Sequence, residues 1–308
     1  MEEDKRVPID RGWAWVILVA NFIVVFLVIG CTSSFGLFFA EFMSEYKASA
    51  SSITVALSVQ TVIFSFSSLF ALNFGTGLAS SRTYIILGGL FGCSAYVISA
   101  IIKDMSYLIL SHGVIFGIAY GFSYGPALVV LSRYFNKKRG MAATLGNMGA
   151  SFGSLIFPPV IRILLDNYGL KGALVIIGGL LLNLCVAGAL MRPVAFYKER
   201  ISGNKVNSKD ILSNQKVWTT NNYEFVGLDN LSSAMAINMM MQGLGLSISN
   251  PILGYLRDTS GSFYASFYVM GSTLIISGVI LFLEPLCRKL EKRRTDSKNI
   301  EQGVVITP

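Results

Sequence analysis

Long apolar stretches, each about 20 residues or longer, alternate with short polar segments along the 308-residue chain. A helix of about 20 residues crosses the hydrocarbon core of a bilayer, which is roughly 30 Å thick. Because the backbone in lipid must satisfy its own hydrogen bonds, each stretch is expected to be helical. The pattern predicts eight spans, at Trp13–Phe39, Ser52–Phe74, Tyr84–Ile102, Tyr107–Leu131, Gly140–Leu165, Gly172–Met191, Ser233–Leu256 and Phe263–Leu283.

The polar segments between these spans divide the chain into regions. We expect a polar head at 1–12, a six-helix transmembrane bundle at 13–191 and a basic loop at 192–230, then two transmembrane helices at 231–283 and a basic tail at 284–308. The first apolar stretch is too long for a cleavable signal peptide and lacks a small-residue cleavage site, so it is interpreted as a span. The predicted fold class is an all-α polytopic membrane protein.

Composition and charge support residence in a membrane. The chain is 53% hydrophobic and only 14% charged, and a soluble domain this apolar would expose too much hydrocarbon. The net charge of +8 comes from loops and the tail, as the positive-inside rule expects, so the bilayer rather than nucleic acid is the predicted partner. With the N-terminus inside, most Lys and Arg residues lie on the inner side, which predicts that both termini are cytoplasmic. The exceptions are Lys47, Lys103, Arg162, Lys171 and Arg257.

The sequence shows no acid, base or metal constellation typical of an enzyme, so neither catalysis nor a cofactor or metal is expected. The single histidine, His112, is expected to be packed or interfacial. Arg162 and Asp166 are four residues apart and are expected to form an ion pair on one helix face. The cysteines lack metal-ligand spacing and are expected to be free thiols. They are Cys31, Cys93, Cys185 and Cys287.

Polar residues and glycines inside the apolar stretches are the remaining candidates for function. Polar side chains are costly in hydrocarbon, which makes them functional candidates. Asn147 lies about two turns into its predicted span, where it fits either a helix–helix hydrogen bond or the lining of a solute cavity. The pairs Gly113/Gly117 and Gly149/Gly153 have the GxxxG spacing that lets two helix backbones approach closely.

Two short segments resemble the signatures of the monocarboxylate transporter family of the major facilitator superfamily. The segment DRGWAW at 10–15 resembles the signature that leads into the family's first span. The segment YFNKKR at 134–139, followed by GMA at 140–142 and GNMG at 146–149, is similar to the signature leading into its fifth span. The motif and gating residues that this resemblance indicates are Asp10, Gly12, Trp13, Trp15, Tyr134, Phe135, Lys137, Arg139, Gly146 and Gly149.

The resemblance also implies an architecture and a function. It covers residues 8–193 and about 225–287, which implies a major-facilitator-like N-terminal six-helix bundle followed by two helices similar to spans eleven and twelve. About four helices of the family's C-terminal half then have no counterpart in this chain. The implied function is transport of a small, monocarboxylate-like organic or aromatic solute across the plasma membrane. A single-span chaperone subunit and self-association are the partners left open.

One departure from the family pattern bears on the mechanism. Proton-coupled symport members carry a lysine in span one at the position that aligns with Ser33, and serine supplies no cation. The chain is therefore expected to be a facilitative carrier rather than a strictly proton-coupled one. The predicted cavity wall comprises Ser33, Phe66, Asn147 and Asn21. The alternative is a transport-inactive shortened form that acts by associating with full-length transporters.

Overall fold

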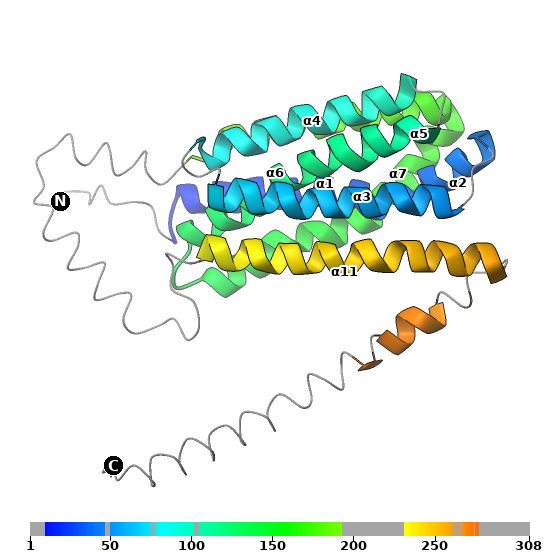
Figure 1. Ribbon diagram of the computed structural model, residues 1–308. Helices are drawn as coiled ribbons and strands as arrows, with labels where there is room; N and C mark the ends of the chain where they lie inside the picture. Colours follow the sequence, from blue (N-terminus) through cyan, green and yellow to red (C-terminus); the bar gives the residue numbers. More distant parts are fainter. Residues whose placement is uncertain are drawn as a thin grey trace, which may run out of the picture. The chain divides into compact units, whose positions relative to one another are not determined.

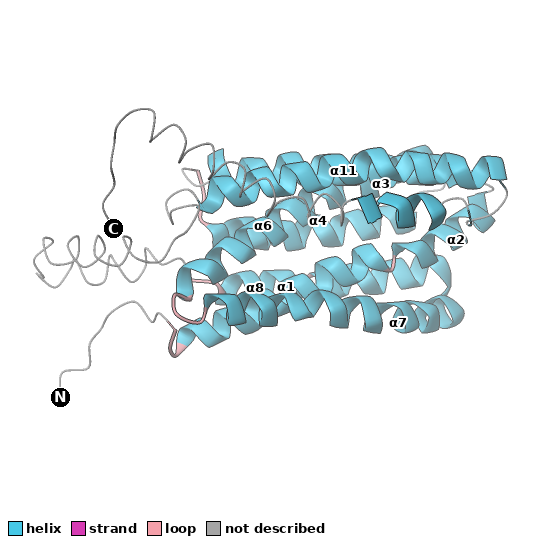
Figure 2. Ribbon diagram, turned by 90° about the horizontal axis from the view of Figure 1, so that it is seen from below, coloured by secondary structure: helices cyan, strands magenta, loops and turns pink. Residues whose placement is uncertain are grey.

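The computed structural model of the chain describes residues 10–46, 50–74, 78–101, 105–192 and 231–260, together with 264, 267–273 and 275–276. This described part consists of helices joined by short turns and contains no strand (Figures 1 and 2). The all-α fold class expected from the sequence is confirmed. Nearly all of the predicted head, loop and tail, and much of the last predicted span, lie outside the described residues.

Five helical segments in the described chain are long and apolar enough to cross a membrane. Their positions match the first six apolar stretches of the sequence, whereas the seventh stretch forms a helix that is not among these segments and much of the eighth lies outside the described residues. The segments are Trp13–Met43, Thr54–Asn73, Ser81–Ile101, Ile109–Tyr134 and Arg139–Leu190.

The first segment consists of two helices, α1 (Trp13–Ser33) and α2 (Phe35–Tyr46), which meet at Ser34. The sequence predicted one uninterrupted span here. Thr32 donates its hydroxyl to the carbonyl of Val28 at 2.9 Å, and hydroxyl side chains of this kind compete with the helical backbone hydrogen bonds. The break at Ser34 therefore lies where the sequence has its run of hydroxyl residues.

In the part of the chain that the structure describes, the middle of the bundle combines α-helices with two π-helical stretches. These are local widenings of a helix that are frequent at functional sites. In chain order the elements are α3 (Ala50–Leu69), η1 (Phe70–Phe74), α4 (Ser81–Ile101), α5 (Met105–Leu108), η3 (Ile109–Ile115) and α6 (Phe116–Tyr134).

The segment after α6 turns back on itself at Gly169. Helix α7 (Arg139–Leu181) continues to α8 (Asn183–Leu190), and a straight helix of this length would measure about 65 Å, twice the thickness of the hydrocarbon core. Gly169 has φ 64° and ψ −178°, and only glycine adopts this conformation without strain. The residues before Gly169, called here the first arm, pack on α1, whereas Gly178 in the second arm packs on Cys93 and Tyr96 of α4.

Two compact units make up the chain, Met1–Ile252 and Leu253–Pro308. The unit boundary falls within α11 (Leu231–Ser260). In the first unit a large apolar cluster joins α1, α4, α6 and α7, and these helices lie side by side (Figure 1). A smaller cluster joins Phe64 and Leu72 of the α3 segment to Ala236 and Met239 of α11.

The hydroxyls of α3 also reach this part of α11. Ser65 donates to the carbonyl oxygen of Met239 at 3.5 Å, and Ser68 lies 2.9 Å from its sulfur. Ser233 donates to the side-chain oxygen of Asn73 at 2.9 Å. The serines of α3 therefore hold a neighbouring helix, a role that the apolar pattern did not predict.

Candidate functional site

Asp10 links the two segments that resemble family signatures. Its carboxylate accepts hydrogen bonds from the backbone N–H groups of Asn136, Lys137 and Lys138 at 3.0–3.4 Å, and its own N–H donates to the carbonyl of Tyr134 at 3.0 Å. These N–H groups lead into α7, where the positive end of the helix dipole favours an anion. Asp10 therefore holds the loop that precedes α7 from a position 126 residues away in sequence.

A tight turn brings Asp10 to this position. Asp10 has φ 59° and Gly12 has φ 50°, both in the left-handed region, which aspartate tolerates better than most residues and which glycine adopts freely. The DRG sequence therefore forms a turn that folds the carboxylate back over the start of α7. The left-handed backbone conformation explains why the first signature has a glycine at position 12.

Aromatic side chains continue the contact between the two signatures. The rings of Trp15 and Phe135 meet edge to face, with centroids 5.7 Å apart. The ammonium of Lys138 lies 5.9 Å from the centroid of the Trp15 ring, within range of a cation–π interaction. Phe135 is buried and Trp15 is partly exposed, so this pair lies at the edge of the bundle.

The end of α8 joins the same cluster. The indole N–H of Trp13 donates to the carbonyl of Leu190 at 3.3 Å, and the hydroxyl of Tyr134 donates to the carbonyl of Arg192 at 2.8 Å. The Arg192 guanidinium lies 4.5 Å from the centroid of the Trp13 ring. The cluster of Asp10, Trp13, Trp15, Tyr134, Phe135, Lys138 and Arg192 is called here the motif junction.

The glycines of α7 pack against α1 without side chains between the backbones. A Cβ atom added at Gly149 would lie 2.5 Å from the carbonyl oxygen of Phe22, and one at Gly153 would lie 2.5 Å from that of Phe26. Such distances are far below ordinary van der Waals contact. Gly149 and Gly153 therefore make the close helix–helix approach that their GxxxG spacing predicted.

Asn21 lies in the same α1–α7 interface and is fully buried. A Cβ atom added at Gly146 would lie 2.5 Å from its amide nitrogen, so Gly146 makes room for the carboxamide. Neither polar atom of the Asn21 side chain has a hydrogen-bond partner in the structure. Its predicted place in a solute cavity stays a prediction, and it would meet a solute only when this interface opens.

The other three predicted cavity residues are exposed. Ser33, at the end of α1, accepts a hydrogen bond from the hydroxyl of Ser154 on α7 at 3.0 Å. Asn147 is exposed on α7, and Phe66 is 53% exposed on α3. The structure therefore joins Ser33 to α7, and the assignment of all three to a cavity remains a prediction.

Four glycines on η3 and α6 form a second close contact that the sequence analysis recognised only in part. Added Cβ atoms at Gly113 and Gly117 would crowd the backbone carbonyls of α3, as predicted by their spacing. The same spacing continues to Gly121 and Gly125, whose added Cβ atoms would meet Ser67 and Ser68 of α3. The sequence signal for this contact was a glycine at every fourth position from 113 to 125.

His112 is buried among aromatic rings. Its imidazole stacks on Phe35 at 3.9 Å and on Phe116 at 4.9 Å between ring centroids, and Tyr96 meets it edge to face at 5.6 Å. The expected packed histidine is therefore observed. Its Nε2 atom is buried without a hydrogen-bond partner, so the ring serves packing between α2 and the α6 segment.

Replacing His112 with phenylalanine is expected to leave the thermal unfolding temperature unchanged or to raise it. Phenylalanine keeps the stacking and removes a buried unpaired nitrogen, which costs about 1–3 kcal/mol. His112→Ala should instead lower the unfolding temperature by several degrees, because it leaves a cavity. Unfolding of the detergent-solubilised protein measures both, and equal losses in the two variants would mean that the imidazole makes a required polar contact.

The ion pair and three of the four cysteines expected from the sequence are found in the described residues. Arg162 and Asp166 form the expected i,i+4 ion pair, with 3.4 Å between Nε and Oδ1 and both side chains exposed. The described cysteines, Cys31, Cys93 and Cys185, are free thiols as expected, and Cys287 lies outside the described residues. Within the described ranges no group of three His, Cys, Asp or Glu residues is arranged to hold a metal ion.

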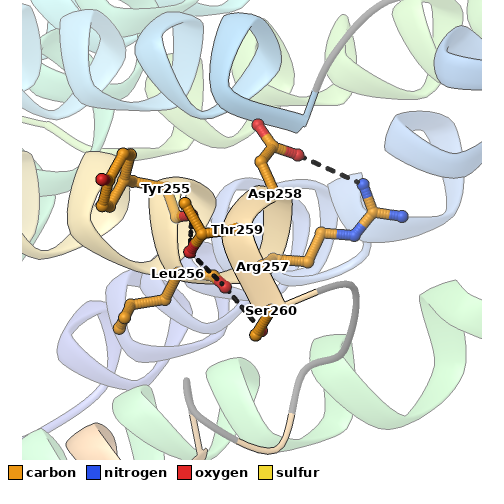
Figure 3. A network of polar contacts seen from close by, with 6 residues as sticks. All are labelled: Tyr255, Leu256, Arg257, Asp258, Thr259 and Ser260. Atoms are coloured by element: carbon orange, nitrogen blue, oxygen red, sulfur yellow. Dashed lines mark hydrogen bonds and ion pairs between the residues drawn. The ribbon is translucent and has the colours of Figure 1, made fainter.

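The end of α11, in the second unit, satisfies its polar groups locally (Figure 3). The hydroxyl of Thr259 donates to the carbonyls of Tyr255 and Leu256, and that of Ser260 donates to Leu256 at 2.6 Å. Arg257 and Asp258 approach to 3.7 Å. Hydroxyls that bond the carbonyls of the preceding turn compete with the backbone hydrogen bonds of the helix.

Comparisons with known proteins agree with this architecture. The family model described as Major Facilitator Superfamily matches residues 22–228. Monocarboxylate transporter 12 of Mus musculus is 29% identical over 66% of this chain and 42% of the relative. Monocarboxylate transporter 14 of Homo sapiens is 34% identical over 61% and 36% of the two chains, and monocarboxylate transporter 7 of Homo sapiens is 30% identical over 68% and 41%. The chain spans less than half the length of these relatives.

Proposed function

We propose that this chain, which belongs to the Major Facilitator Superfamily, is a membrane carrier for a small monocarboxylate or a related organic or aromatic solute, and that it acts at the plasma membrane. The observation that carries this proposal is the similarity to proteins named monocarboxylate transporters over about two thirds of the chain. The apolar helices long enough to cross a bilayer support a multi-pass carrier rather than an enzyme.

Facilitated transport is proposed in preference to strict proton coupling. In the proton-coupled members that the chain resembles, a lysine occupies the position of Ser33. Here that position holds a hydroxyl, and its partner is a second hydroxyl, that of Ser154. Two neutral groups do not bind and release a proton in the physiological range, so this part of α1 offers no obvious proton carrier.

The proposed cavity wall includes the exposed Ser33, Asn147 and Phe66, and Asn21 joins it if α1 and α7 separate. In transporters of this kind, substrate sites lie near the bilayer midplane between parts that rock around them. An exposed aromatic ring on α3 and polar groups on α1 and α7 suit a small organic solute. The side chain of Asn21, which is buried without a hydrogen-bond partner, would then form a hydrogen bond to solute or water.

The motif junction is proposed to lie on the cytoplasmic side, with both termini of the chain on that side. The excess of Lys and Arg in the corresponding sequence segments supports this orientation. The backbone N–H of Lys137 donates a hydrogen bond to Asp10 at 3.0 Å. The side-chain ammonium of Lys137 takes no part in this bond and can reach solvent. Lys137 and Arg139 are then the cations that orient the helices and gate the inner side.

A second candidate function is association without transport. It is favoured by one observation: the chain spans less than half the length of the curated relatives. Carriers of this type alternate access between two halves. A chain that supplies one half would act by binding a full-length transporter, a second copy of itself or a single-span chaperone subunit.

Uptake in cells separates these two functions. Cells expressing the chain at the surface should take up labelled lactate, pyruvate or an aromatic acid above the level of mock-transfected cells. If none enters, and if co-expression lowers the uptake by a full-length monocarboxylate transporter with which the chain co-purifies, the association function replaces the carrier function. Surface biotinylation controls for expression in both arms.

A further inference from the structure

One end of the first unit carries most of the exposed positive charge of its described residues. Trp13 and Trp15 at the start of α1 lie beside the end of α8 and the loop at 135–138. The start of α4 lies at the same end, because a Cβ atom added at Gly188 of α8 would be 3.1 Å from Cγ2 of Ile85. The exposed cations of this end are Arg11, Arg82, Arg133, Lys137, Lys138 and Arg192.

Four of these cations pair with no carboxylate in the part of the chain that the structure describes. They are called here the cation cluster and are Arg11, Arg82, Lys137 and Lys138. The carboxylate of this end, that of Asp10, accepts hydrogen bonds from backbone N–H groups rather than from these side chains. The other described carboxylates of the first unit lie on α2 and beside the turn of α7 at Gly169. The cation cluster therefore keeps a net positive charge.

Hydrogen bonds and an aromatic contact hold part of the cation cluster in place. The backbone N–H groups of Lys137 and Lys138 donate to Asp10 at 3.0 and 3.3 Å, and the Lys138 ammonium lies 5.9 Å from the centroid of the Trp15 ring. The positive-inside rule accounts for an excess of cations on one side of a membrane, but it does not require them to be ordered. Groups that are already ordered lose less conformational entropy when they bind a ligand.

The tryptophans indicate the depth of the cation cluster in the bilayer. Tryptophan is enriched at membrane–water interfaces, where its ring lies at the level of the lipid headgroups. Trp13 follows Arg11 by two residues, and Trp15, which is 39% exposed, contacts Lys138. The cluster is therefore expected to face the headgroup layer. Several Lys and Arg residues gathered next to a transmembrane helix attract anionic lipids.

We propose that the cation cluster binds the headgroup of a phosphoinositide, an anionic phospholipid that carries more than one phosphate. The four cations come from three segments, namely the turn before α1, the start of α4 and the loop before α7. Phosphates placed around an inositol ring can contact side chains from more than one of these segments, whereas a single phosphate cannot. Lys and Arg side chains both form charge-assisted hydrogen bonds to phosphate oxygens. The binding does not depend on transport of a solute.

A lipid titration in nanodiscs tests the site. The purified full chain with Trp218→Phe is placed in phosphatidylcholine nanodiscs, and energy transfer from Trp13 and Trp15 to an acyl-labelled phosphatidylinositol bisphosphate gives the dissociation constant. The double variant Lys137→Gln/Lys138→Gln is expected to bind roughly 30-fold more weakly, from the contribution of two cations near a membrane surface.

The matched control is Arg162→Gln/Lys171→Gln, which removes the same charge around the turn of α7 at Gly169. Its dissociation constant should stay near that of the parent. Equal weakening in the two double variants would overturn the site. If size exclusion shows that Lys137→Gln/Lys138→Gln is misfolded, Arg82→Gln takes its place and should weaken binding about fivefold. Unchanged binding by Arg82→Gln would also overturn the site.

Competing ligands test the identity of the occupant. Phosphatidylserine, added at equal total charge, should displace the labelled lipid much less than unlabelled phosphatidylinositol bisphosphate does. Equal displacement would overturn the requirement for more than one phosphate. Soluble inositol trisphosphate carries phosphates on the same ring but has no acyl chains, and at the same concentration it should displace little of the lipid. Full displacement by this compound would mean that a soluble polyphosphate, rather than a lipid, occupies the site.

Discussion

Replacing Gly153 with alanine is expected to lower the unfolding temperature of the detergent-solubilised protein by several degrees. An added Cβ would lie 2.5 Å from the carbonyl oxygen of Phe26 and 3.0 Å from the Cα of Gly30. Both neighbours are backbone atoms, so α1 and α7 must move apart to admit the methyl group. Overpacking of this kind costs about 1–3 kcal/mol, and the α1–α7 interface includes Asn21 and the motif junction at its end.

Gly179→Ala is the matched control for this variant. Gly179 lies in the second arm of α7, and no atom stands within 4 Å of the position its Cβ would take. Alanine at an open helical position is favoured over glycine by about 1 kcal/mol, so this variant should unfold at the same temperature as the parent or higher. If Gly153→Ala and Gly179→Ala behaved alike, the direct backbone contact between α1 and α7 would be wrong.

Replacing Asp10 with alanine is expected to be nearly as damaging. The change removes hydrogen bonds to three backbone N–H groups in the loop that precedes α7, and a hydrogen bond of this kind contributes about 0.5–1.5 kcal/mol to stability. It also removes hydrogen bonds that link the signature segment at 10–15 to the one at 134–139. Limited proteolysis at the 134–139 loop should become faster, and the unfolding temperature should fall.

Asp166→Ala is the appropriate comparison, because it removes the same carboxylate from an exposed site. The ion pair of Asp166 with Arg162 has both side chains more than 60% exposed, and pairs of this kind contribute about 0.5 kcal/mol or less. Proteolysis at the 134–139 loop should therefore be unchanged in Asp166→Ala. A loop equally protected in Asp10→Ala and in the parent would contradict the role of Asp10 in holding this loop.

The positions of the helices were predictable from the sequence because lipid imposes a single rule on length and polarity. The turn between the fifth and sixth predicted spans was expected between Leu165 and Gly172, and the structure has it at Gly169. The break at Ser34 was missed because Trp13–Phe39 is apolar apart from Asn21 and its hydroxyl residues, and hydropathy does not detect local competition for backbone hydrogen bonds.

The site was less predictable than the fold. Family resemblance identified Asp10 and Lys137, but a hydrogen bond between segments 127 residues apart depends on how the helices pack. The sequence could not distinguish the buried Asn21 from the exposed Asn147, because both are single polar residues in apolar stretches.

The most direct measurement is uptake by the purified chain alone in proteoliposomes with equal pH on both sides. The carrier account predicts saturable entry of at least one solute from a panel of lactate, lactamide and aromatic acids, above the level of protein-free liposomes. It also predicts that an imposed pH gradient leaves the initial rate unchanged. No entry of any solute with a monodisperse, correctly oriented chain, or entry only when a proton gradient is imposed, would contradict it.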